Sequence, residues 1–344
     1  MNFSCTKTDI RSPYFGLTRY ETKTGWFLYL DKGWIKTENY YYKGLHSSWC
    51  KIYIDPVIRI ETNKFRDFPI YHNDTEVSNF KKMDNVVPVD GCVEIDKDIK
   101  IDYQQFFYQR IGMEKLSFND CHNTLLEALT ENVSTFASSN TRPVYMPVQR
   151  GIDTLTVRSV FDFLGVEYQT FDLPKEAPVP SLLRSELSKN HWGFTQVVEK
   201  DQGVLVTGFY GDEWILRNPY YVHILLSSRG INLTAEFDSR QSCYMKKYFE
   251  HYREKCGHET NITIEQLITQ MCNDFQIWHL NDTRYFSPLK HESLIHLLNA
   301  DDQTVLDQVT DAKLSRSIIE KCNPNLLELI DDTKNQHDPY YFAI

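Results

Sequence analysis

The sequence lacks any long uninterrupted run of apolar residues. No stretch approaches the roughly 18 apolar residues that a membrane-spanning helix needs, and the N-terminus has no apolar core of the kind that a secretory signal carries. The 8 cysteines are scattered, with no pair spaced as C-x-x-C. In a chain of 344 residues without a signal, scattered cysteines are expected to be reduced thiols. These absences predict a cytoplasmic protein that is not embedded in a membrane.

Short motifs that identify common enzyme classes are also missing. The chain has neither GxxxxGK nor GxGxxG, the glycine-rich loops that bind phosphate groups, and it has neither GxSxG nor HExxH. A set of potential metal ligands does occur in the C-terminal part, namely Cys243, His251, Cys256, His258 and Cys272. Because their spacings match no familiar zinc site, we expect neither a bound metal nor a cofactor.

Basic residues are outnumbered: 37 Lys and Arg stand against 47 Asp and Glu, which gives a formal net charge of -10. Proteins that bind nucleic acid usually present a positive surface, so we expect no nucleic-acid partner. Aromatic residues are abundant, with 21 Tyr, 20 Phe and 6 Trp. Aromatic side chains favour strands and protein interfaces, which predicts a protein partner or a homo-oligomer. An AT-rich genome would produce the same aromatic bias.

The length and the hydrophobic pattern predict three lobes. Residues 1–112 are β-rich, and residues 25–30 and 34–37 flank a turn, which predicts a hairpin. Residues 50–54 alternate between apolar and polar side chains, which predicts a strand with one solvent-facing side. We expect this lobe to be an antiparallel sheet or a small barrel that serves recognition or assembly.

The second predicted lobe, residues 113–225, mixes helices and strands. Ser117 and Asp120 have the spacing of a capping box, and a leucine-rich helical pattern follows them. A second amphipathic helix is predicted over residues 153–164. It would end at Gly165 and point Leu155, Val160, Phe163 and Leu164 inward. Strands are predicted at residues 143–148, 166–171, 194–198, 203–209 and 213–217, and a further helix at residues 181–187.

The third predicted lobe, residues 226–344, is mostly helical. Its short amphipathic segments predict helices at residues 244–255, 264–271, 291–298, 304–309, 314–321 and 326–330. Short helices with acidic connections suggest a small bundle or a docking lobe. The fold class predicted for the whole chain is therefore α+β.

Cys121 is the candidate nucleophile, because it follows the predicted start of a helix. A thiol must be ionised to attack, and the partial positive charge of a helix N-terminus lowers the thiol pKa. The alternative is structural: Cys121, Leu125 and Leu129 are spaced by four residues and would form one buried helical face.

The segment DQGVLVTGFYGDEWILRNPY resembles the strand pair that carries the catalytic His and Asn of papain-like thiol enzymes. In this resemblance, which covers residues 117–220, Cys121 matches the nucleophile and Asn218 the residue that orients the imidazole. About 80 residues separate Cys121 from the strand pair in the sequence. This separation resembles that of the shorter relatives, the C39-like peptidases and the butirosin-H-like acyltransferases, more than that of papain-family enzymes. Gln202 stands where these families have the catalytic His, and glutamine cannot act as a general base.

Two functions follow from this pattern. The first is a non-catalytic binding or assembly protein built on a degenerate papain-like domain, with Gln202, Trp192 and Trp214 in the binding surface. The second is a cysteine-dependent acyl-transfer enzyme, either an amide hydrolase or an acyltransferase. In it Cys121 would attack, His191 would replace the missing base and Asn218 would orient the imidazole.

Overall fold

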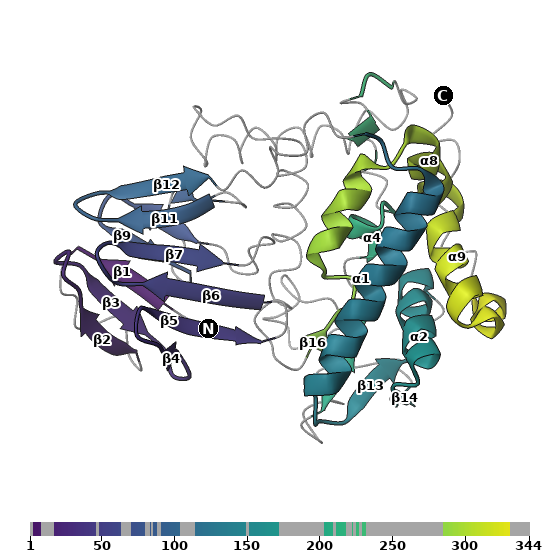
Figure 1. Cartoon of the computed structure of the whole chain (residues 1–344), viewed down its shortest axis with the longest axis horizontal. Coiled ribbons are helices and arrows are strands. Elements are labelled where there is room, and N and C mark those ends of the chain that lie inside the picture. Colours follow the sequence, from purple (N-terminus) through teal and green to yellow (C-terminus); the bar gives the residue numbers. More distant parts are fainter. Residues whose placement is uncertain are drawn as a thin grey trace, which may run out of the picture. The chain divides into compact units, whose positions relative to one another are not determined.

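The structure is a computed structural model of the chain. It describes residues 3–7, 17–45, 48–62, 70–79, 83, 85–87, 91–103, 114–148, 151–171, 203–208, 211–217, 222, 225–226, 229–231 and 285–330. Helices and sheets are both present, so the predicted α+β class is confirmed. The chain forms two compact units (Figure 1). Unit 1 comprises Met1–Met113 and Asp238–Asn281, and unit 2 comprises Glu114–Phe237 and Asp282–Ile344.

Unit 1 contains two antiparallel sheets of six strands each. The first sheet has the spatial order β10 (Asn85–Val86), β8 (Tyr71–Asn73), β9 (Glu76–Ser78), β1 (Phe3–Thr6), β3 (Phe27–Leu30) and β2 (Thr18–Glu21). The second has the order β12 (Ile99–Tyr103), β11 (Gly91–Ile95), β7 (Ile58–Thr62), β6 (Ser48–Tyr53), β5 (Tyr40–Leu45) and β4 (Ile35–Lys36).

One hydrophobic core holds unit 1 together, and both sheets contribute to it. Cys5 and Leu28 come from the first sheet, and Ile52 and Ile60 from the second. Along β6, Cys50 and Ile52 are buried while the side chains between and after them are only partly buried, so the predicted alternation is confirmed. The two inner faces therefore bury their apolar side chains against each other.

The predicted hairpin of residues 25–30 and 34–37 is wrong. Strand β3 pairs with β1 and β2, whereas β4 pairs with β5 in the other sheet. The turn between them passes the chain from one sheet to the next. Asp31 fixes this turn by accepting hydrogen bonds from Trp34 and from Lys43 of β5, each at 2.8 Å. Gly33 has a φ of 89°, a left-handed conformation that suits glycine.

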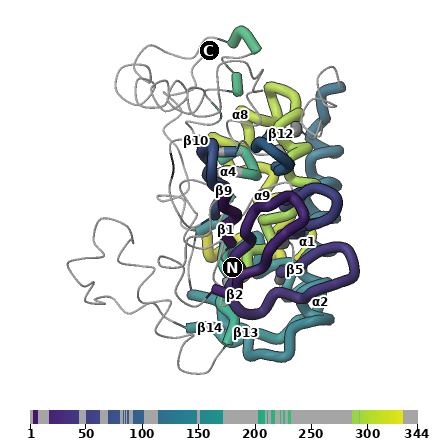
Figure 2. The backbone as a smooth tube through the Cα atoms, turned by 90° about the vertical axis from the view of Figure 1, so that its left-hand side faces the viewer, coloured from purple at the N-terminus to yellow at the C-terminus, as the bar shows by residue number. Residues whose placement is uncertain are grey.

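Unit 2 is built on a four-stranded parallel sheet. The spatial order is β14 (Gln169–Phe171), β13 (Val144–Pro147), β15 (Val204–Val206) and β16 (Tyr285–Phe286). The described helical segments are α1 (Phe118–Ser139), α2 (Ile152–Leu164), α4 (Gly211–Trp214), η3 (Glu292–Asn299), α8 (Asp302–Asp311), α9 (Lys313–Cys322) and η4 (Pro324–Leu329). Helix α1 packs against α2, α9 and η3, and β13 and β14 lie side by side at one end of the unit (Figures 1 and 2).

Local signals placed the helix ends of unit 2 correctly. Helix α1 begins at a capping box. The side chain of Ser117 accepts a hydrogen bond from the amide of Asp120, and the carboxylate of Asp120 accepts one from the amide of Ser117. Helix α2 ends at Gly165, which is left-handed. Leu155 and Val160 are buried as predicted, but Phe163 is 53% exposed, so its inward orientation was predicted wrongly.

The helices of the C-terminal segment occur close to where the sequence predicts them, from η3 to η4. They do not form a lobe of their own, because α9 packs on α1 and α2, and η3 packs on α1. The boundary near residue 113 coincides with the division between the units, whereas the boundary near residue 225 does not. The helices predicted at residues 181–187, 244–255 and 264–271, and the strand at 194–198, lie outside the described residues.

The strand predicted at residues 213–217 is wrong. The segment forms the single helical turn α4 and continues through a turn to Arg217. Leu216 has a φ of 59°, which a leucine rarely adopts, so the chain cannot extend here as a strand. Among the described helices, none combines the length and the apolar character that crossing a bilayer requires.

Candidate site at the carboxyl edge of the parallel sheet

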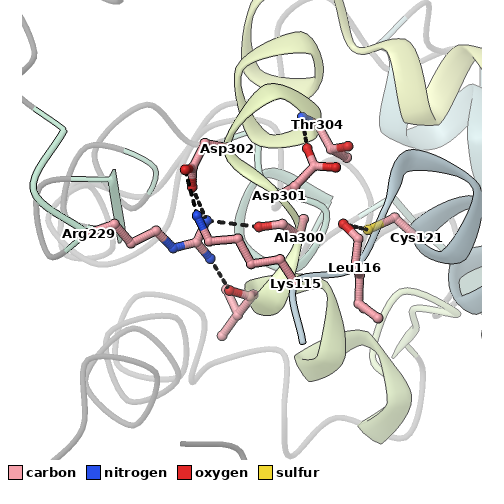
Figure 3. Close-up of polar contacts among 9 residues, drawn as sticks. Lys115, Leu116, Cys121, Arg229, Ala300, Asp301, Asp302 and Thr304 are labelled. Atoms are coloured by element: carbon pink, nitrogen blue, oxygen red, sulfur yellow. Dashed lines mark hydrogen bonds and ion pairs between the residues drawn. The ribbon is translucent and has the colours of Figure 1, made fainter. Parts of the chain in front are cut away.

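Cys121 lies in the first part of α1, and its thiol faces Leu116 (Figure 3). Its side chain is fully buried, and its thiol lies 3.9 Å from the carbonyl oxygen of Leu116. Leu116 in turn forms a β-bridge with Ala300. The amide of Leu116 donates to the carbonyl of Asn299 at 2.9 Å, and its carbonyl accepts from the amide of Asp301 at 2.8 Å. The hydrogen-bonded backbone of Leu116 and residues 299–301 therefore covers the thiol.

This environment opposes ionisation of the thiol. Burial, together with the negative charges of Asp301 and Asp120, raises the pKa of Cys121 to about 12. These effects outweigh the helix N-terminus, which would lower the pKa. Leu125 and Leu129 are also fully buried. The arrangement fits the structural alternative, in which Cys121 belongs to the core face of α1.

The other residues of the predicted site are less informative. His191, Trp192, Gln202 and Asn218 lie outside the described residues. Trp214 ends α4 and is fully buried, so it cannot lie in an exposed binding surface as predicted.

His122, which follows Cys121 in the sequence, lies 2.8 Å from the hydroxyl of Ser317 on α9 through its Nδ1. This contact ties α1 to α9, and it is made with a helix that carries no part of the predicted site. Of the segment that carries the papain-like resemblance, β15 pairs with β13 and β16, and residues 211–214 form the helical turn α4.

The candidate metal ligands between Cys243 and Cys272 also fall in the part of the chain that is not described. Within the described residues, no three His, Cys, Asp or Glu side chains are grouped as a metal site would require.

The order of the parallel strands points to a different place. After β13 the chain passes through α2 to β14 on one side, yet the next described strand, β15, lies on the other side of β13. The direction in which the sheet grows thus reverses between β13 and β15. In open parallel sheets, ligands bind beyond the carboxyl ends of the strands at such a reversal. The carboxyl ends of β13 and β15 therefore define the candidate site.

Two glycines bring the chain after β15 against the first turn of α2. A methyl group on Gly208 would lie 2.5 Å from the carbonyl carbon of Asp153 and 2.9 Å from the Cα of Thr154. A methyl group on Gly211 would lie 2.5 Å from the Cβ of Asp153. Only a residue without a side chain fits at either position. The N-cap of α2 is also a glycine, Gly151, which has no side chain to cap the helix.

A partly buried ion pair joins the two segments at this edge. Nη1 of Arg217 lies 3.0 Å from Oδ1 of Asp153, and the side chain of Arg217 is 3% exposed. Only three charged residues are buried in the described part of the chain. One is Glu76 of unit 1; the others are Arg217, which follows β15, and Lys290, which follows β16. Burying a charge is costly, so two buried cations after neighbouring strands are notable.

Backbone strain coincides with the same segment. Leu216 directly precedes Arg217, and its left-handed conformation costs on the order of 1–2 kcal/mol for a residue with a side chain. Strained residues cluster at functional sites, where the surrounding structure holds them in place. Here the strain accompanies the placement of Arg217 beside Asp153.

Sequence reasoning missed this site although part of the signal was visible. Gly151 follows a predicted strand and precedes a predicted helix, Gly208 lies near the end of another predicted strand, and Gly211 follows that strand. The pattern matches neither full phosphate-loop motif, so the sequence alone does not identify it as a binding site. That β13 and β15 are parallel neighbours could not be read from either segment alone. No family model matches this chain, and no curated protein matches it.

Proposed function

We propose that unit 2 binds a small anionic ligand, with a nucleotide as the favoured class, at the carboxyl ends of β13 and β15. The reversal of strand order between these strands carries the proposal. Nucleotides bind at this position in other open parallel sheets, because loops from both sides of the reversal form a crevice there.

The charge of the edge supports an anionic ligand. The N-terminus of α2 carries the equivalent of about half a positive charge, which favours phosphate or carboxylate groups. Two buried basic residues, Arg217 and Lys290, follow the neighbouring strands β15 and β16. Asp153 offsets one of these charges through its ion pair with Arg217. Guanidinium groups bind phosphate groups well, so a ligand could share Arg217 with Asp153.

The proposal keeps the class of binding protein that the sequence suggested, and it moves the binding site away from Cys121. The thiol enzyme is the weaker candidate, because the burial and the raised pKa of Cys121 remove the thiolate that nucleophilic attack requires.

The charge at the N-cap of α2 offers a direct test. In Gly151→Asp, a carboxylate would occupy the position that an anionic group of the ligand takes, and repulsion should weaken binding by at least about tenfold. A methyl group on Gly151 would meet no atom within 4 Å, so Gly151→Ala should leave binding nearly unchanged. Asp is a good N-cap residue, so Gly151→Asp should not lower the thermal midpoint.

Binding is measured by isothermal titration calorimetry with ATP, ADP, AMP and inorganic phosphate. Asn119→Asp is the charge control, since Asn119 is an exposed residue in the first turn of α1 and the substitution adds the same charge in the same unit. If none of the four probes binds the wild-type protein, the proposal fails for nucleotides. If Gly151→Asp and Asn119→Asp bind equally well, the ligand does not lie at the edge of β13 and β15.

A further inference from the structure

Helix η3 begins at an imidazole rather than at a hydroxyl or a carboxylate. Nδ1 of His291 accepts a hydrogen bond from the amide of Ser293 at 3.3 Å, so this side chain caps the helix. The other ring nitrogen, Nε2, lies 3.4 Å from Oε2 of Glu131 on α1. A nitrogen that accepts a hydrogen bond carries no proton, so the single proton of the neutral ring is on Nε2, facing Glu131.

We propose that His291 is a pH-sensitive cap that holds the first turn of η3 near neutral pH and releases it in mild acid. Adding the second proton places it on Nδ1 and removes the acceptor. The N–H of the imidazolium and the N–H of Ser293 would then face each other as two donors. The ring must turn away, and the first turn of η3 loses its cap. This inference does not depend on the ligand site proposed above.

Within the described part of the chain, Glu131 and the helix N-terminus act on the protonated ring in opposite directions. Glu131 attracts the imidazolium, but its side chain is 71% exposed, and an ion pair in that setting contributes little. The N-terminus of a helix disfavours a positive charge. Helix α4 also packs against η3 and carries Asp212 and Glu213, whose side chains are outside the described part. Loss of the cap therefore outweighs the gain from Glu131.

At the opposite end of η3, Arg229 makes contacts with groups that do not titrate in the same range (Figure 3). Arg229 donates to the carbonyls of Leu298 and Ala300, and to Asp302, each at 2.8 Å. Burial opposes ionisation of Asp302, but hydrogen bonds from Lys115 and Arg229 outweigh it and lower the pKa of Asp302. That carboxylate stays ionised while imidazole groups take up protons. The contacts of Arg229 therefore persist when His291 is protonated.

The segment before η3 is also fixed independently of pH. Nδ2 of Asn132, a buried residue of α1, donates to the carbonyls of Pro288 and Lys290 at 2.9 and 3.3 Å. An amide group does not titrate, so this attachment persists when His291 is protonated. The first turn of η3 is consequently the part that should open.

Hydrogen–deuterium exchange tests the proposal on the full chain. Amides in the first turn of η3 should exchange about five-fold faster at pH 5.5 than at pH 7.5, after correction for intrinsic rates, which corresponds to the loss of one cap. In His291→Asn the side chain can still cap but cannot titrate, so the acceleration should disappear. Glu131→Gln should keep it, because the cap and not the ion pair is responsible. The proposal is overturned if the wild-type protein shows no acceleration, if His291→Asn shows the same acceleration, or if Glu131→Gln abolishes it.

Discussion

Replacing Gly208 by alanine should destabilise unit 2, because the added methyl group has no room. The new Cβ would lie 2.5 Å from the carbonyl carbon of Asp153 and 2.9 Å from the Cα of Thr154. Both are backbone atoms in the first turn of α2, so no side-chain rotation relieves the clash. Either the chain after β15 or the start of α2 must shift, and the shift would disturb the ion pair of Asp153 and Arg217.

The expected loss of stability depends on the kind of atom that the new methyl group would contact. Overpacking usually costs about 1–3 kcal/mol, and a clash with backbone belongs at the upper end, about 3 kcal/mol. For a unit of between about 150 and 250 residues, 1 kcal/mol lowers the thermal midpoint by about 2–4 °C. Gly208→Ala should therefore lower the midpoint of unit 2 by roughly 6–12 °C.

Gly151→Ala is the matched control, since it makes the same chemical change where a methyl group meets no atom within 4 Å. Alanine is a poorer N-cap than glycine, so the control should lose no more than about 1 kcal/mol. Differential scanning calorimetry measures both variants. Equal midpoints for Gly208→Ala and Gly151→Ala would refute the close approach of β15 to α2, and with it the geometry of the candidate site.

Two further predictions concern titratable groups of unit 2. Cys121 should react with iodoacetamide more slowly than Cys322, by at least about tenfold at pH 8. The pKa values of the two thiols are raised to about 12 and about 11, respectively, and of the two only Cys322 is partly exposed. Labelling is read by mass spectrometry, and faster labelling of Cys121 would restore it as a candidate nucleophile. Asp302→Asn should lower the free energy of unfolding by about 1 kcal/mol at pH 7. Because its pKa is lowered in the folded state, ionised Asp302 stabilises the protein above pH 4 and loses this effect as the pH falls further, so the variant and the wild type should converge in acid-titrated urea unfolding.

The sequence alone determined features that depend on neighbouring residues. The capping box of Ser117 and Asp120 marks the start of α1, because both hydrogen bonds are made within one helical turn. Gly165 marks the end of α2, because the left-handed conformation there favours a residue without a side chain. The alternation in β6 identified its buried face, since successive side chains of a strand point to opposite sides.

Only the tertiary structure decided which segments pair and which side chains are enclosed. Strands β3 and β4 are adjacent in sequence yet belong to different sheets, and β13 joins β15 across a long stretch of chain. The pattern of Cys121, Leu125 and Leu129 was compatible with an exposed nucleophile or with a core face, and the bridge of Leu116 to Ala300 closed the space around the thiol.

The candidate site depends on the same kind of long-range contact. Gly208 and Asp153 are distant in the chain, and they meet because parallel pairing brings the carboxyl ends of β13 and β15 to one edge. A local pattern encodes the conformation of its own residues, whereas strand order is set by burial summed over the whole unit, and no single segment carries that information.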